Sequence, residues 1–376
     1  MVLICLSYLC RRCSPFAVPS NLKDLPELAA GGVCGFKCFT IESGVDEFPC
    51  VNPEQLKAAM EVVVASAPHL PVLVHAEACA AHEHAELTAA ASKADPRAYA
   101  SYLASRPPTF ESSAIASAIS LAEQTGARMH VVHLSAQEGL PLFEAARARG
   151  SGNVSVETCP HYLTLDADTI PAGATAYKCA PPIREKSNQA ALWKALRAGT
   201  IPMIVSDHSP CEPALKCLET GDFAQSWGGI SSLQLGLPLI FSELRAQAEA
   251  AGEAFDEDKA VLSLHEWMSA APARFVHFAH RKGSLLVGHD ADIVAWDPRG
   301  DVLVAKEMIH HRHKLTPYLG RTLRGAVRKT FLRGAVVYAA EEGQACTFSA
   351  PQGARVYPAE HAFEAQRAAE AKASKQ

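Results

Sequence analysis

The most informative absences in this sequence are those of strong charge, of long apolar runs and of repeated cysteine pairs. The chain has 376 residues and a formal net charge of −5, with 35 basic and 40 acidic residues. Nothing in that balance indicates a nucleic acid or a membrane surface as a partner. No apolar run reaches the roughly 18 residues that a membrane-spanning helix needs. The composition, 48% hydrophobic and 20% charged, is that of a globular protein with one large core or two domains.

The cysteine pattern excludes a zinc ribbon. Of 12 cysteines, only Cys10 and Cys13 have the CxxC spacing, and no second pair completes a set of four ligands. The other cysteines are scattered, so we expect reduced, mostly buried thiols in a cytoplasmic enzyme. The final residues, KASKQ, are no peroxisomal signal.

Residues 1–20 differ from the rest of the chain. They are apolar and cysteine-rich, and Arg11 and Arg12 follow the apolar stretch, whereas a secretory signal has its positive charge in front. We expect an atypical N-terminal segment that arises from an alternative start or a gene-model artefact.

From Asn21 onward, strand-like and helix-like segments alternate, which is typical of α/β proteins. Four strand-like runs carry metal-capable side chains near their ends: Lys37 in GFKCF, His75 in PVLVH, His133 in HVVH and Asp207 in VSD. VSVET is a fifth strand between the last two. Ligands at the C-terminal ends of successive strands indicate a (β/α)8 TIM-like barrel.

The number of strands predicts a barrel that is incomplete at the front. Each βα unit takes about 30 residues, and only five of eight units are visible, so strands 1–3 are expected to be missing. Such a barrel cannot close and leaves edge strands unpaired. The predicted divisions are an atypical segment at 1–20, the barrel at 21–281, a β-sandwich portion at 282–360, built from short strands such as SLLVG and ADIVAWD, and a polar tail at 361–376.

Lys37 is predicted to face the barrel interior near the end of its strand. A buried ammonium is costly unless it is paired or neutral. A neutral lysine can add CO2 to give a carbamate, an anion whose two oxygens can bridge two cations. An ion-paired or snorkelling lysine is the alternative, but the position ahead of His75 and His133 favours the carbamate.

His75 and His133 are the histidines predicted to be ligands, although a lone His75 could also be a satisfied core residue. On a strand, positions three apart face opposite sides, so His130 and His133 are not expected to point the same way. His133 lies nearer the C-terminal end of its strand and is chosen as the ligand. His130 is then expected to face the surrounding helices as a structural residue.

Asp207 ends an apolar strand in SDHSP and is the predicted catalytic residue. An aspartate there can ligate a metal, hold the attacking water and pass a proton to the leaving nitrogen. The alternative is an aspartate that only caps the turn before Pro210.

Two other histidine groups are not expected to bind metal. The HEH run at 82–84 lies in an Ala-rich helical stretch, where positions two apart do not share a face. His310, His311 and His313 lie in the β-rich tail, and we expect them to be solvated or structural, away from the barrel strands.

Several phrases resemble the allantoinases, a branch of the cyclic amidohydrolases that also include dihydroorotase and dihydropyrimidinase. In chain order they are GFKCF, SGVDEFP, LVHAE, ETCPHYL, KCAPPIR, VSDHSPC, WGGI, GHDADIVAWD, HKLTPYLGRTLRG and FLRGAVVY. The resemblance runs from about Asn21 to the mid-350s. GFKCF with SGVDEFP, and SDHSPC, favour the allantoinases over the hydantoinase branch.

The resemblance implies hydrolysis of the hydantoin ring of allantoin to give allantoate, in purine catabolism. It implies two divalent metal ions, Zn2+ or Co2+, that share a hydroxide and are bridged by an N6-carboxylated Lys37. By position, His75 and His133 hold one ion, and Asp207 contributes to the other. It also implies a homotetramer as the assembly.

The same resemblance suggests residues that contact the substrate. Ala180 in KCAPPIR and Ser209 in SDHSP lie on loops above the strand ends, where their main chain can contact the ring amide. Cys159 and His161 in CPHYL are placed near the site by the same reasoning.

The chain departs from this family in one respect. A His-x-His pair on the first strand completes the family's site, and this chain starts too late to contain it. We therefore expect an N-terminally truncated chain and a poor enzyme. Two alternatives stay open: a dihydropyrimidinase- or hydantoinase-like enzyme, and an inactive isoform or fragment that acts at most by binding full-length subunits.

Overall fold

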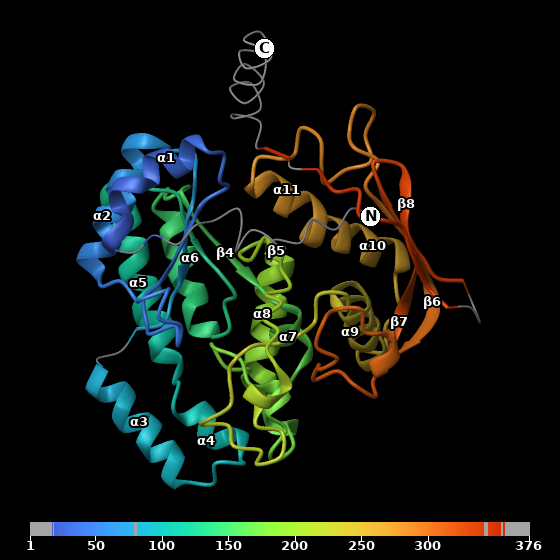
Figure 1. The fold of residues 1–376 in the computed structure, drawn as a ribbon, viewed down its shortest axis with the longest axis horizontal. Helices are drawn as coiled ribbons and strands as arrows, with labels where there is room; N and C mark the ends of the chain where they lie inside the picture. The colour runs from blue at the N-terminus through green and yellow to red at the C-terminus, as the bar shows by residue number, and fades with distance from the viewer. Residues whose placement is uncertain (1–16, 18, 79–80, 342–344, 355, 358–376) are drawn as a thin grey trace.

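The computed structural model describes residues 17, 19–78, 81–341, 345–354 and 356–357, with the side chains of 19, 81–84 and 92 left out (Figure 1). Most of the predicted segment 1–20, the pair Cys10 and Cys13, the side chains of the HEH run at 82–84 and the tail at 361–376 therefore lie outside the described residues.

Helices and strands alternate through the first two thirds of the described chain. The helices are α1 (Leu25–Ala30), α2 (Pro53–Ser66), α3 (Ala81–Lys93), α4 (Tyr99–Ala104), α5 (Pro108–Thr125), α6 (Leu140–Ala148), α7 (Pro160–Thr164), α8 (Lys186–Ala198), α9 (Gly236–Ala250), α10 (Glu257–His265) and α11 (Ala271–Phe275), with a π-helical turn at Glu266–Ala270 between the last two. Short 3₁₀ turns lie at Pro19–Asp24, Gln137–Gly139, Ala167–Thr169, Thr175–Tyr177, Pro213–Lys216 and Lys306–Met308. The strands are β1 (Phe36–Phe39), β2 (Val72–His75), β3 (Met129–Val131), β4 (Val154–Thr158), β5 (Met203–Ile204), β6 (Ile293–Leu303), β7 (Thr322–Leu332), β8 (Ala335–Ala339) and β9 (Thr347–Phe348).

Helix α2 shows how local sequence sets an element. Asn52 accepts a hydrogen bond from the main chain of Gln55, whose side chain in turn accepts one from the main chain of Asn52, and Pro53 occupies the first turn. This reciprocal cap satisfies amide groups that a helix start leaves without partners. The apolar residues of α2 recur at the spacing of one helical face, so the helix buries Leu56, Ala59, Met60 and Val63.

Within the described residues, β1 to β5 form one parallel sheet in sequence order. Residues paired across the sheet share a face, and Lys37 is in register with Leu73, which is in register with His130. His75, two residues after Leu73, shares that face too. His130 therefore shares the face of Lys37, contrary to the expectation from strand alternation, because His133 lies beyond the end of β3. The ring of His130 still packs on a helix, as expected of a structural residue, with its centroid 4.3 Å from that of Phe275 at the end of α11.

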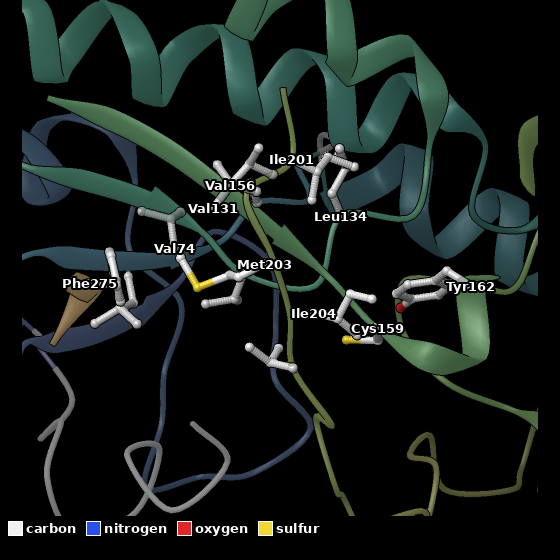
Figure 2. Packing of buried hydrophobic residues seen from close by; sticks show 14 of the residues in the cluster. Val74, Val131, Leu134, Val156, Cys159, Tyr162, Ile201, Met203, Ile204 and Phe275 are labelled. Carbon is white, nitrogen blue, oxygen red and sulfur yellow. The ribbon is translucent and has the colours of Figure 1, made fainter. Parts of the chain in front are cut away.

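The opposite face of this sheet is apolar and is covered by helices. Val74, Val131 and Val156 are in register on neighbouring strands and are buried, as Figure 2 shows. Helices α5 and α6 contact β3 and β4. Met203 pairs with Glu157 and so belongs to the same face as Lys37. The sheet is therefore an α/β layer with one face for packing and one face that carries polar groups.

A second, antiparallel sheet follows in the order β6-β7-β8-β9 (Figure 1). Helix α9 packs against β7, and the ring of its Phe241 lies 4.9 Å between centroids from that of Trp296 on the neighbouring strand β6. The strand expected at 284–288 is wrong, because these residues form turns and loop in which Val287 is fully exposed.

Three element boundaries also differ from the sequence-based expectation. The third and fifth strands of the parallel sheet are shorter than their apolar runs, and α9 begins at Gly236 rather than near Gly228. No helix among the described residues has the length and apolar character to cross a membrane.

Candidate metal centre

The site lies on the polar face of the parallel sheet, at the C-terminal ends of its strands. Lys37 on β1 and His75 at the end of β2 are both buried. His133, just after β3, is equally buried, and its ring centroid lies 4.5 Å from that of His75 with the planes at 68°. The Nζ atom of Lys37 lies 4.5 Å from the centroid of the Phe39 ring. The structure thus places these three predicted ligands together.

His133 and Asp207 both adopt left-handed backbone conformations, with φ of 45° and 38°. L-residues rarely adopt this region, and where they do it is often at functional sites. Each of the two follows a strand that has just ended, β3 and β5 respectively. The turn lets each side chain leave the strand direction at the rim of the sheet.

Glu77 is a buried carboxylate that sequence reasoning missed. Its Oε2 atom lies 2.7 Å from Nε2 of His75 and 2.6 Å from a guanidinium nitrogen of Arg106. Burial alone would raise the pKa of Glu77, but the charges of Arg106 and His75 outweigh it and lower the pKa to about 2. The spacing of two residues after His75 in LVHAE was the available signal, whereas Arg106 is distant in sequence.

The histidines of the site are held neutral. Burial lowers the pKa of His75, and Glu77 only partly opposes this. Burial also lowers the pKa of His133 to well below its usual range, and the neighbouring His75 and Lys37 lower it further. A neutral imidazole has a lone pair for a cation. Since Nε2 of His75 is next to Glu77, Nδ1 of that ring is the nitrogen left for a ligand.

Asp207 shares the electrostatic environment of these residues. Burial raises the pKa of Asp207 to about 6, the ammonium of Lys37 opposes the rise and the carboxylate of Glu157 adds to it. Glu157 is itself placed by β4, and its Oε2 lies 3.0 Å from Nε2 of His130. Nδ1 of His130 also forms a hydrogen bond with the hydroxyl of Ser155, at 2.7 Å. His130 therefore supports the sheet face below the site.

Cys159 and His161 lie beside Asp207. One donor atom from each of the three residues lies within 4.8 Å of those of the other two. Cys159 lies between the end of β4 and the start of α7, which carries His161, and both residues are fully buried. Burial lowers the pKa of His161 to about 3, and burial followed by the charge of Asp207 raises the pKa of the Cys159 thiol well above its usual range.

The loop that carries Ala180 is fixed by two tyrosines. The hydroxyl of Tyr102 donates to the carbonyl of Cys179 at 2.6 Å, and that of Tyr162 donates to the carbonyl of Pro181 at 2.8 Å. The main chain of Ala180 thus lies between two tethered carbonyls. A rigid loop can present main-chain groups without paying for their ordering when a ligand binds.

The conformation of the Ser209 loop depends on contacts with Ile230, Gly229 and Lys216. The amide of Ser209 donates to the carbonyl of Ile230 at 2.9 Å. A Cβ atom at Gly229 would lie 2.5 Å from the carbonyl oxygen of Ser209, so only glycine fits there. The buried ammonium of Lys216 donates to the carbonyls of Gly229 at 2.6 Å and Lys178 at 3.0 Å. Lys216 therefore joins the Ala180 and Ser209 loops.

A buried ion pair supports the segment after His133. Glu111 accepts hydrogen bonds from the amides of Ser135 and Ala136 at 2.9 and 3.1 Å, and from Arg184 at 2.9 Å. Burial raises the pKa of Glu111, while the charge of Arg184 opposes the rise. These bonds connect the start of α5 with both the His133 loop and the loop that follows Ala180.

One expectation about the histidine-rich tail is wrong. His311 lies beside the site, with its ring centroid 4.9 Å from that of His208, the residue after Asp207. Nδ1 of His208 accepts hydrogen bonds from the amides of Ser232 and Leu233 at 3.0 and 3.1 Å. His310 instead contacts the rings of the antiparallel sheet, such as Phe348 at 4.8 Å. Only part of the tail cluster is thus remote from the parallel sheet.

The donor set fits divalent cations. Two neutral imidazoles, a carboxylate and a lysine that CO2 can convert to a carbamate suit zinc and similar ions. Nδ1 of His133 is buried without a hydrogen-bond partner among the described residues, as expected of an atom kept for a ligand. The carboxylate–histidine pair of Glu77 and His75 has the form that supports metal-binding histidines.

Comparison with known proteins shows the family. A profile of the Amidohydrolase family matches residues 23–337. The allantoinase of Streptomyces avermitilis is 43% identical over 337 residues, which is 90% of this chain and 69% of that protein. The allantoinase of Saccharomyces cerevisiae is 40% identical over 329 residues, covering 87% of this chain and 67% of that protein. This chain thus spans about two thirds of the length of these relatives.

A solved structure agrees with this result. The L-hydantoinase (dihydropyrimidinase) from Arthrobacter aurescens superposes with a TM-score of 0.76 at 29% identity, covering 89% of this chain and 70% of that chain. The sequence relatives are allantoinases, and this structural match is a hydantoinase. The chain belongs to the amidohydrolase family and, within it, to the allantoinases.

Proposed function

We propose that this chain opens the hydantoin ring of allantoin to give allantoate. The observation that carries the proposal is the meeting of Lys37, His75, His133 and Asp207 at one end of a parallel sheet, in a chain of the allantoinase family. The pKa of each of the last three responds to the ammonium of Lys37, which is consistent with one shared site.

The fold proposed for this function is a TIM-like barrel in an incomplete form. Residues 21–281 make up the barrel portion, and residues 282–360 make up the β-sandwich portion. The five parallel strands of the first part and the antiparallel sheet of the second support this division. The superposition on a hydantoinase supports it as well.

The proposed cofactors are two divalent cations, zinc or cobalt. N6-carboxylated Lys37 would bridge them, His75 and His133 would hold one, and Asp207 would contribute to the other. When bound, such ions polarise a ring carbonyl and lower the pKa of water. Glu77 keeps the ring of His75 in one orientation, with Nε2 toward the carboxylate and Nδ1 toward the site.

Asp207 is the proposed acid–base residue. Its carboxylate, at the rim of the sheet beside the other proposed ligands, can accept a proton from the attacking water and return it to the leaving nitrogen. Ala180 and Ser209 would contact the ring amide through their main chain, on the two loops that Lys216 joins. Cys159 and His161 would line the substrate side of Asp207. A homotetramer is the proposed assembly.

Two other functions are supported by specific observations. The structural match to a hydantoinase favours a related cyclic amide, such as hydantoin or dihydrouracil, as an alternative substrate. The sequence has no histidine before His69, so the family's His-x-His pair is not within these 376 residues. A non-catalytic chain that binds full-length subunits is the second alternative.

The test uses the purified chain loaded with zinc in the presence of bicarbonate. Allantoin, hydantoin, dihydrouracil and dihydroorotate are compared, with Lys37→Ala as the control. We expect slow, Lys37-dependent hydrolysis of allantoin over the other three. Equal turnover by Lys37→Ala would refute the proposal, and preference for hydantoin or dihydrouracil would favour the alternative substrate. Bound metal with no turnover of any substrate would favour the non-catalytic function.

A further inference from the structure

The triad Cys159, His161 and Asp207 is a second group of metal-capable side chains at the site, beside Lys37, His75 and His133. Its three donor atoms lie within 4.8 Å of one another. A zinc ion binds sulfur at about 2.3 Å and nitrogen or oxygen at about 2.0–2.2 Å, so one ion fits between them after small side-chain rotations.

His161 gives independent support. The residue has no exposed surface, and neither ring nitrogen has a hydrogen-bond partner among the described residues. A buried imidazole with two unsatisfied nitrogens is costly and calls for a ligand. The ring packs against that of Tyr162, with centroids 4.2 Å apart and the planes at 64°.

We propose that Cys159, His161 and Asp207 bind one soft divalent cation, zinc or cadmium, at a position separate from Lys37, His75 and His133. The donor set of thiolate, neutral imidazole and carboxylate suits these ions and not magnesium or calcium. Binding releases the thiol proton to solvent and forms the metal–sulfur bond. The two anionic ligands then cancel the charge of the ion, which keeps the cost of a buried charge low.

The position has a consequence for catalysis, which rests on the proposed function. Asp207 is the only residue shared between the triad and the family's site. A cation held by Cys159 and His161 also binds the carboxylate of Asp207, and this carboxylate is the group proposed to carry the proton. Zinc in excess, or cadmium, is therefore an inhibitor that acts through a thiolate bond.

The test is a cadmium titration of chelator-treated protein, with the ultraviolet thiolate-to-cadmium charge-transfer band as the readout. We expect one saturable band, lost in Cys159→Ser. His161→Asn should weaken cadmium binding by more than about tenfold, the lower end of what losing even a supporting side chain costs a metal site. Cys179→Ser, which removes a buried thiol outside the triad, is the matched control and should keep the band.

A second variant separates this proposal from the proposed function. His75→Ala with His133→Ala removes the family-type ligands and should keep the thiolate band, while Cys159→Ser should still bind metal by elemental analysis. Circular dichroism verifies that each variant is folded. A band that survives in Cys159→Ser, or is lost in Cys179→Ser, overturns the triad assignment. Loss of the band in the double histidine variant overturns the claim that the two positions are separate.

Discussion

Nε2 of His75 lies 2.7 Å from the carboxylate of Glu77, and both side chains are buried at the end of β2. Arg106 contacts the same carboxylate from α4's C-terminal side, at 2.6 Å. In this arrangement, the ion pair of Glu77 and Arg106 orients the neutral ring of His75. The orientation of His75 is therefore decided by groups that would never touch a metal.

Glu77→Gln should weaken metal binding without unfolding the protein. The amide keeps the size of the side chain but cannot hold the histidine as a carboxylate does, and loss of such a partner costs about 10–100-fold in metal affinity. Equilibrium dialysis with zinc measures the change. Glu86→Gln, at an exposed position on α3, is the control and should bind as the unchanged chain does. Equal affinities for the two variants would contradict the role of Glu77.

His133→Ala and His130→Ala should have different effects. Removing His133 should lower bound metal, because it removes a proposed ligand. Removing His130 should leave the metal count unchanged but destabilise the fold by about 1–3 kcal/mol, since it breaks contacts with Ser155 and Glu157 inside the sheet. Elemental analysis and denaturant unfolding measure the two quantities. Loss of metal from His130→Ala would show that the ligands are wrongly assigned.

Substitutions at Lys37 test whether this residue is carboxylated to a carbamate. Lys37→Ala should be poor in metal and inactive, and acetate or propionate should restore part of the bound metal by filling the vacated space with a carboxylate. Lys37→Arg should stay metal-poor with either acid, because a permanent cation repels both ions. Loading the unchanged chain without CO2 should also reduce bound metal. Full metal content after CO2-free loading would mean that Lys37 does not act as a carbamate.

The regular part of the fold was predictable because it depends on local pattern. Pro53 and the apolar spacing after it predicted α2, and apolar runs predicted the strands that carry Lys37 and His75. The strand expected at 284–288 failed because its apolar residues are exposed, with Leu285 at 64% of its accessible surface. Apolar residues in a sequence do not by themselves show that the segment packs against another part of the protein.

The site was predictable only where it follows strand geometry. Lys37 and His75 sit at regular positions, so alternation placed them on one face. Alternation failed at His133, because its left-handed backbone breaks the period of two that had assigned His130 to the other face. The contact between Glu77 and Arg106 joins residues 29 apart in sequence, and no local pattern signals such a pair.

Lys216 should make stability depend on pH. Burial lowers its pKa to about 8, so the folded state disfavours the charged ammonium that the unfolded chain keeps up to about 10.5. The resulting cost, up to about 3 kcal/mol, is present below pH 8 and is lost as pH rises toward 10.5. The unchanged chain should therefore gain stability relative to Lys216→Met over this interval, measured by urea unfolding. Lys57→Met, at an exposed position, should show no such trend.

At position 133, glycine should give a more stable protein than alanine, which is the reverse of their usual order of stability. Alanine normally stabilises a chain relative to glycine, because it restricts the unfolded state. At a φ of 45°, however, alanine retains a backbone strain of about 1 kcal/mol or more that glycine lacks. His133→Gly should therefore melt at a higher temperature than His133→Ala, and the same comparison applies at Asp207. Melting in the ordinary order would mean that the left-handed turn is not imposed by the fold.

These two left-handed turns also bear on how the protein can evolve. A laboratory selection for heat resistance alone would favour glycine at positions 133 and 207 and would discard both proposed ligands in the process. A selection for activity would keep the histidine and the aspartate and accept the less stable backbone. The ratio of glycine to ligand residues recovered at these positions would therefore report which of the two pressures a population of variants had experienced.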